Sequence, residues 1–152
     1  MQEMQVKSEY TELPYEVVNL QQNEIANVYW VAEKKTMVCE AVHEYMPQDD
    51  FKILFTEISN YVAKYRPENF VFDKRALKAF HQPSMEWYFT EWKNDMSKLY
   101  GLKKHRKLLP NITWFGLAVK AGRAELAKKY PEAEFHNLDI QYKNSIQDAI
   151  NS

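Results

Sequence analysis

Asp73 and Arg75 directly follow the apolar run Phe70 to Phe72, and His81 and Ser84 come shortly after them. A short continuous apolar run predicts a strand that is buried on both faces of a sheet. Ligands of open α/β sheets bind beyond the carboxyl ends of such strands, so these polar residues are the best candidates for a ligand-binding or catalytic site. The favoured alternative is that Asp73 and Arg75 form an ion pair or cap neighbouring backbone, because their spacing alone shows no convergence on a ligand.

Other site chemistries lack the spacing that they need. The histidines are His43, His81, His105 and His136, and none has a second His or an acid at metal-ligand spacing such as H-E-x-x-H. The sequence contains no G-x-S-x-G motif, and its 3 glycines are too scattered for a phosphate-binding loop. Cys39 lies in an expected strand, which favours a core residue over a nucleophile. We therefore expect no catalytic residue, no metal and no cofactor.

A basic run from Lys103 to Lys107, read as KKHRK, is the strongest local charge feature. Such a run could contact phosphates, which makes nucleic-acid binding a weak alternative function. We favour a solvated edge strand from Lys103 to Leu109, because lysines on an exposed edge also prevent unwanted strand pairing.

Helices are expected on both sides of the central strand. Spacings of three and four between apolar residues predict them, and their ranges are Asp50 to Arg66, Ser84 to Tyr100, Asn111 or Thr113 to about Tyr130, and a short helix from Ile146. The apolar stripe of the second helix runs from Met85 to Leu99. Trp87 falls outside this stripe and is expected to be exposed, as a pocket or homodimer contact.

Strands are expected where β-branched and aromatic residues cluster. Their ranges are Tyr15 to Leu20, Asn27 to Ala32, Thr36 to Val42, the central run Phe70 to Phe72, Lys103 to Leu109 and Ala133 to Ile140. The early strands follow one another and the later ones alternate with helices. This order predicts an α/β fold with a mixed sheet of about five to six strands, flanked by about four helices.

The composition is typical of one folded domain. Of 152 residues, 45% are hydrophobic and 14% aromatic, with only 3 Gly and 6 Pro. These values exclude a low-complexity chain and predict a core of normal size. We expect residues 1–14 to be a flexible lead-in and residues 15–152 to form a single domain.

Net charge and cysteine content indicate the compartment. A formal charge of -1 gives no overall attraction to nucleic acid or to an anionic membrane. Cys39 is the only cysteine, so an intrachain disulfide is excluded and a reducing compartment is expected. No apolar run approaches the ~18 residues that a membrane span requires, and the first residues lack the apolar core of a signal peptide. We therefore expect a cytoplasmic protein without membrane contact.

A family resemblance rests on four features. They are FVFDKRAL at Phe70 to Leu77, the pair Trp87 and Trp92, GLKKH before Pro110, and the ending FHNLDIQYKNSIQDAI. Over roughly Tyr15 to Ile150 the chain resembles the STAS-like fold of the sporulation anti-sigma-factor antagonists. It is more closely similar to the small SpoIIAA-like (STAS-like) proteins of unknown function. This resemblance implies a mixed sheet flanked by helices and a role in binding rather than catalysis.

One motif of the antagonists is missing. In them, a phosphorylatable serine lies in an Asp-Ser-Ser-Gly-like motif at the start of the helix that follows the central strand. Here that region reads DKRALKAFHQPSMEW, which leaves Ser84 as a positional candidate for phosphorylation. A phosphate at a helix N-terminus is chemically favourable, but helix capping is the favoured role for Ser84.

The expected function is that of a non-catalytic regulatory or protein-interaction module of STAS-like type. Its partner would be an unidentified protein or a second copy of the chain. The alternative is a small-ligand-binding protein or enzyme that uses Asp73, Arg75 and His81. A weaker alternative is nucleic-acid binding through Lys103 to Lys107.

Overall fold

The computed structural model describes residues 8–79 and 81–152, and its centre is a six-stranded sheet with the strand order β1-β2-β3-β4-β5-β6. The strands are β1 (Val18–Gln22), β2 (Ala26–Val31), β3 (Thr36–Ala41), β4 (Asn69–Asp73), β5 (Lys104–Leu108) and β6 (Asp139–Tyr142). The first three strands pair antiparallel, and β3 to β6 pair parallel. The prediction of an α/β fold with a mixed sheet is therefore confirmed.

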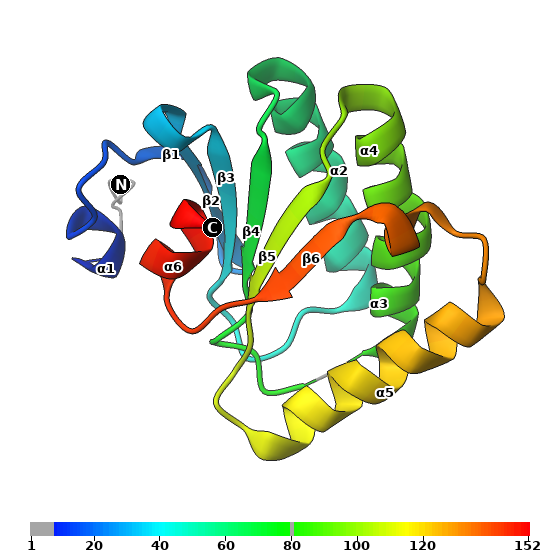
Figure 1. Ribbon diagram of the computed structural model, residues 1–152. Coiled ribbons are helices and arrows are strands. Elements are labelled where there is room, and N and C mark those ends of the chain that lie inside the picture. The colour runs from blue at the N-terminus through cyan, green and yellow to red at the C-terminus, as the bar shows by residue number, and fades with distance from the viewer. Residues whose placement is uncertain (1–7, 80) are drawn as a thin grey trace.

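The helices are α1 (Ser8–Thr11), α2 (Gln48–Tyr65), α3 (Gln82–Trp87), α4 (Lys93–Tyr100), α5 (Thr113–Lys129) and α6 (Ile146–Asn151), with a π-helical turn, η2 (Tyr88–Trp92), between α3 and α4. Helices α2 to α5 lie in the connections between the parallel strands, whereas α1 precedes the first strand and α6 follows the last (Figure 1). As the sequence predicted, α2 ends before Pro67. Gly101 at φ 71° ends α4 in the left-handed conformation that glycine adopts readily.

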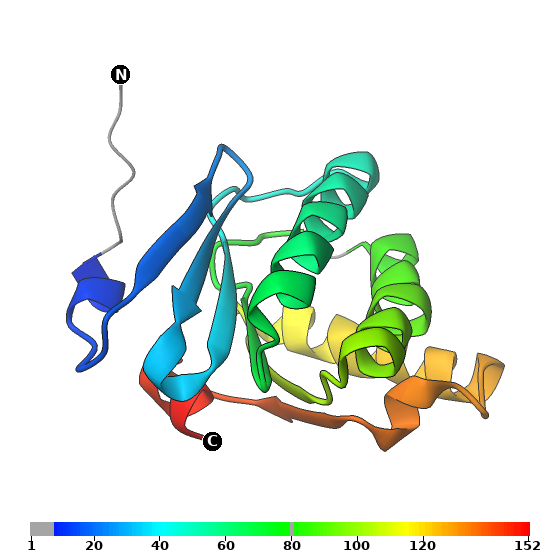
Figure 2. The same cartoon turned by 90° about the horizontal axis from the view of Figure 1, so that it is seen from above.

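The two faces of the sheet are covered by different elements, so β4 is buried on both (Figures 1 and 2). Successive side chains of a strand point to opposite faces. Phe70 and Phe72 pack against α2, η2 and α4 in one apolar cluster, while Val71 packs with α1 and α6 in the other. The central apolar run is thus explained by burial on both sides.

The π turn changes which residues of its helix are buried. Its wider hydrogen-bond spacing rotates the residues that follow it relative to a regular helix. Leu99, which the spacing placed on the apolar stripe, is 63% exposed, whereas Tyr100 packs against the core. Lys93, the first residue after the turn, is fully buried.

The segment from Lys103 to Leu109 contains a strand, β5, as predicted, but the prediction that it is a solvated edge strand is wrong. β5 lies between β4 and β6, and its residues His105, Arg106 and Lys107 are at most 2% exposed. The edge strand on this side of the sheet is β6, which begins only at Asp139. Half of the segment from Ala133 to Ile140, predicted to be a strand, forms the short 3-10 helix η3 (Glu134–Asn137).

Of the expected lead-in over residues 1–14, the described part contains α1 and packs against the sheet. Residues 1–7 lie outside the described residues. In α1, Tyr10 is 0% exposed and packs on the sheet with Leu13. An aromatic side chain that covers the open face of a sheet removes apolar surface from water, which explains why this segment is ordered.

No helix within residues 8–79 and 81–152 has the length and apolar character that crossing a membrane requires.

Candidate functional site

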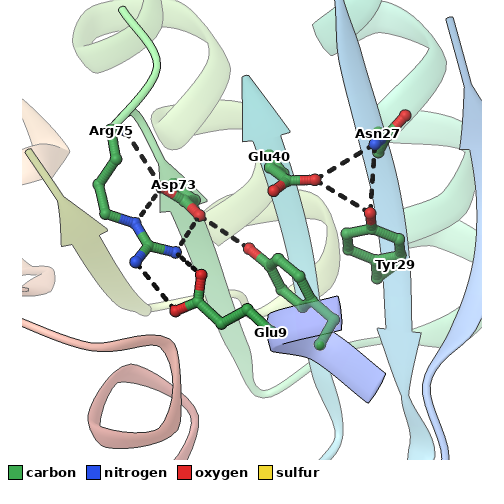
Figure 3. Close-up of polar contacts among 7 residues, drawn as sticks. Glu9, Asn27, Tyr29, Glu40, Asp73 and Arg75 are labelled. Carbon is green, nitrogen blue, oxygen red and sulfur yellow. Dashed lines mark hydrogen bonds and ion pairs between the residues drawn. The ribbon is translucent and has the colours of Figure 1, made fainter. Parts of the chain in front are cut away.

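Asp73 and Arg75 form a close ion pair at the carboxyl end of β4, as the favoured interpretation of the sequence held (Figure 3). Arg75 donates from Nη2 to Asp73 Oδ2 at 2.7 Å and from Nε to Oδ1 at 2.9 Å. The same guanidinium also donates to both oxygens of Glu9 in α1, at 2.9 and 3.0 Å. Hydrogen bonds to Asp73 are the largest cause that raises the pKa of Arg75.

Tyr10, in α1, adds a further hydrogen bond to this network. Its hydroxyl donates to Asp73 Oδ2 at 2.9 Å, and its ring lies 4.5 Å from the ring of Tyr29. Burial, followed by the charge of Asp73, raises the pKa of Tyr10, so its hydroxyl stays a hydrogen-bond donor.

Glu40 lies beside Asp73, because the two residues are register partners on β3 and β4. Its Oε1 accepts from Tyr29 at 2.9 Å and from Asn27 at 3.2 Å (Figure 3). Both carboxylates are only 2% exposed, and a cavity of about 310 Å³ opens beside them. Buried carboxylates require donors of this kind, and here the chain itself supplies them.

His81 and Ser84 are placed together but apart from Asp73. His81 is the N-cap of α3, and its Nδ1 accepts from the Ser84 backbone N–H at 3.3 Å and lies 2.9 Å from Ser84 Oγ. The cap is thus His81, and the expectation that Ser84 is the cap is wrong. Ser84 is only 5% exposed, which places its hydroxyl out of reach of a modifying enzyme while α3 is folded. The two residues line a small cavity that Asp73 and Arg75 do not reach.

Trp87 is half-buried rather than exposed. Its ring lies edge-on to Phe51 at 6.0 Å, and Lys52 Nζ lies 5.9 Å from the ring centre. The exposed tryptophan among the described residues is instead Trp114 at the start of α5, which is 51% exposed.

A second group of charged residues, which the sequence analysis did not identify, lies on the opposite, helical face. Lys93 and Lys107 are 0% exposed, and Lys74 is 8% exposed. Lys107 Nζ lies 4.1 Å and Lys93 Nζ 4.4 Å from the ring centre of Phe89. We call these three residues the buried lysine cluster.

The cluster lacks the partners that buried charges normally have. Lys93 and Lys107 interact with each other through their Nζ atoms, and neither these atoms nor the Tyr88 hydroxyl has another hydrogen-bond partner in the described part of the chain. Burial lowers the pKa of Lys93 and Lys107 well below the usual value, and repulsion from Lys74 and Arg123 lowers both further. Titratable groups shifted in this way are frequent at functional sites, and buried polar groups without partners require an explanation.

A groove between α5 and β6 borders this cluster. Its volume is about 770 Å³, and apolar side chains of Leu109, Val119, Leu138 and Ile140 contribute to its walls. Its charged lining residues within the described ranges are basic, namely Lys120 and Arg123. Arg123 donates to the Tyr142 hydroxyl at 3.0 Å and lies 5.7 Å from the ring centre of Phe89, beside the lysines.

The sequence held one overlooked signal for the cluster. Lys93 falls four residues after Phe89 and three before Met96, which is the spacing of the apolar stripe. A lysine at a stripe position indicates a buried amine. Lys107 gave no such signal. A run of basic residues is typical of a solvent-exposed strand, and only the strand order shows that this one is buried.

Within residues 8–79 and 81–152 no group of His, Cys, Asp or Glu side chains is arranged to hold a metal ion. Cys39 is buried, and burial raises the pKa of its thiol well above the usual value. Comparisons with protein-family models, with curated proteins and with solved structures find no match to the chain.

Proposed function

We propose that this chain is a STAS-like domain that binds a small amphipathic anion in the groove between α5 and β6. The resemblance of its sequence implies a domain that acts by binding, and the mixed sheet flanked by helices agrees with that expectation. The binding site of this proposal differs from the one expected around Asp73, Arg75 and His81. Asp73 and Arg75 already satisfy each other, so they offer a ligand little unused hydrogen-bonding capacity.

The observation that carries the proposal is the combination of apolar walls and basic side chains in one groove. A volume of about 770 Å³ lies in the range of small-molecule sites, roughly 300 to 1,000 Å³. Apolar walls favour a hydrocarbon or aromatic body, while Lys120 and Arg123 favour a carboxylate, sulfate or phosphate at one end.

The buried lysine cluster strengthens this preference. Arg123 lines the groove and its charge acts on Lys93 and Lys107, so the potential between the groove and the cluster is positive. Coulomb interactions are stronger where water is excluded, and an anion near Arg123 would relieve repulsion among these bases.

Isothermal titration with three ten-carbon ligands tests the proposal: decanoate, decanol and decylamine. We expect decanoate to bind, decanol to bind at least about tenfold more weakly, and decylamine not to bind, because only decanoate pairs with a guanidinium. Arg123→Gln should weaken decanoate binding about tenfold or more. Lys128→Gln is the matched control, because Lys128 lies on the same helix outside the groove. Equal binding of decanoate and decanol, or no effect of Arg123→Gln, would contradict the proposal.

A protein partner, including a second copy of the chain, is the second candidate occupant of this surface. Trp114 and Leu117 favour it, because these large apolar side chains of α5 are 51% and 63% exposed. Native mass spectrometry distinguishes the two functions. A monomer that retains an anionic small molecule supports the ligand proposal, and an empty dimer that Leu117→Asp dissociates supports the second.

A further inference from the structure

Lys74 lines a small cavity at the carboxyl end of β4. The cavity measures about 50 Å³, and its wall includes Phe72, Leu77, Met85 and Tyr88. His81 and Ser84 line the same cavity, so the hydrogen-bonded pair that caps α3 faces the space that Lys74 borders. Lys74 therefore differs from Lys93 and Lys107, which do not line it.

The surroundings of Lys74 favour a neutral amine. Burial is the largest cause that lowers its pKa, to about 8, and repulsion from Arg123 lowers it further. The titratable and charged groups around it come from every neighbouring element, and they are Cys39, His81, Tyr88, Lys93, Lys107 and Arg123. Within the described ranges no carboxylate is among the groups that shift the pKa values of the three lysines.

We propose that Lys74 is an amine nucleophile that forms an imine with a small 2-oxo carboxylate in this cavity. A desolvated lysine beside other cations is a known way to activate an amine toward carbonyl groups. The inference does not depend on the ligand of the α5 groove, because it concerns a different cavity and a covalent bond.

The chemistry balances without any oxidant or reductant. The lone pair of Lys74 Nζ attacks the carbonyl carbon, and the new C–N bond leaves a carbinolamine after proton transfer from nitrogen to oxygen. Loss of the hydroxyl with a proton then releases one water and leaves a C=N bond. His81 and Ser84, on the same cavity wall, are positioned to deliver the proton that the departing hydroxyl needs.

The walls define the size and charge of the carbonyl compound. A space of about 50 Å³ between apolar side chains admits a molecule of two or three carbons. The Tyr88 hydroxyl borders this region and makes no hydrogen bond to a described residue, so it can donate to a carboxylate. The charge of Arg123, which acts on Lys74, favours the same negative charge.

Reductive trapping tests the proposal on the intact chain. The protein is incubated at pH 7 with glyoxylate and sodium cyanoborohydride, and modified lysines are located by peptide mass spectrometry. We expect Lys74 to be labelled at least about tenfold faster than Lys78, whose side chain is 65% exposed. Lys74→Arg should abolish this fast labelling, and Lys78→Arg, the matched control, should leave it unchanged.

Three further comparisons make the result decisive. Acetaldehyde, which lacks the carboxylate, and phenylglyoxylate, which is too large, should each label Lys74 at least about tenfold more slowly than glyoxylate. Labelling of Lys74 should reach half its maximum near pH 8, since only the neutral amine reacts, whereas exposed lysines should require a higher pH. Labelling of wild-type Lys74 no faster than that of Lys78 would overturn the proposal even if Lys74→Arg fails to fold. Equal rates with all three compounds would overturn the assigned substrate class.

Discussion

Lys107 and Asp73 show two ways in which this protein buries a charged side chain. Asp73 receives hydrogen bonds from Tyr10 and from Arg75, so its charge is compensated inside the fold. Lys107, on the neighbouring strand, faces the ring of Phe89, and its hydrogen-bond partner among the described residues is a second base, Lys93. A cation above an aromatic ring regains only part of the hydration energy that burial removes. The two sites should therefore respond differently to pH and to mutation.

Lys107→Met should raise the free energy of unfolding at pH 7 and flatten its dependence on pH. Burial lowers the pKa of Lys107 in the folded state, so between that value and about 10.4 the unfolded chain binds the extra proton. Wild-type stability should then rise with pH, by up to about 1.4 kcal/mol per pH unit from this one group. Urea unfolding at pH 7.0, 7.5 and 8.0 measures both slopes.

The unfolding measurements stop at pH 8 because, above that pH, the titration of Cys39 lowers the free energy of unfolding as pH rises. Its thiol is buried with a raised pKa, so the unfolded thiol loses its proton first and favours unfolding. Lys104→Met, one strand position before His105 and only partly buried, is the control that should leave the slope unchanged. Identical slopes in wild type and Lys107→Met would show that Lys107 is protonated in the folded protein.

At the scale of the elements, glycine positions show which local conformations the fold imposes. Gly101 ends α4 at φ 71°, and Gly116 lies within α5. A methyl group added at either position meets no atom within 4 Å, so any effect of alanine comes from the backbone alone. This makes the two glycines a matched pair.

Gly101→Ala should destabilise the fold by about 1 to 2 kcal/mol, because an L-residue pays that cost in the left-handed region. Gly116→Ala should stabilise it by about 0.5 to 1 kcal/mol, because alanine loses less conformational freedom in a helix. Chemical unfolding of both variants under one set of conditions measures these changes. Effects of the same sign would contradict the conformational explanation.

At the scale of the whole molecule, the helices cover the sheet unequally. α2 buries Phe51, Leu54 and Phe55 against the sheet, whereas a groove of about 770 Å³ separates much of α5 from β6. α5 therefore lies along the margin of the core in Figure 1. Local opening costs less where fewer apolar contacts must be broken.

Hydrogen exchange should reflect this difference. Amides in the middle of α5, near Lys120, should exchange at least about tenfold faster than those in the middle of α2, near Ile58. Decanoate at saturation should slow exchange in α5 and leave α2 unchanged, because a ligand stabilises the region that it contacts. Mass spectrometry of peptic fragments measures both. Equal protection of the two helices without ligand would show that the groove does not weaken the attachment of α5.

The elements were largely predictable, whereas the candidate site was not. The α2 boundary at Pro67, the left-handed Gly101 and the Ser145 cap of α6, whose Oγ accepts from the Asp148 N–H at 3.1 Å, follow from local backbone chemistry. The ion pair of Asp73 and Arg75 is likewise a local contact, two residues apart. By contrast, Lys74, Lys93 and Lys107 meet only after three separate elements pack.

The sequence by itself determined the α/β class, the central strand and the main helices, because periodicity, proline and glycine act through near neighbours in the chain. Only the tertiary structure decided that β5 is an interior strand, that α1 covers the carboxylates, and that Asp73 and Lys74 serve opposite faces of the sheet. Strand order and burial depend on contacts between residues far apart in sequence. A side chain such as Lys107 therefore acquires its unusual protonation from neighbours that no local pattern identifies.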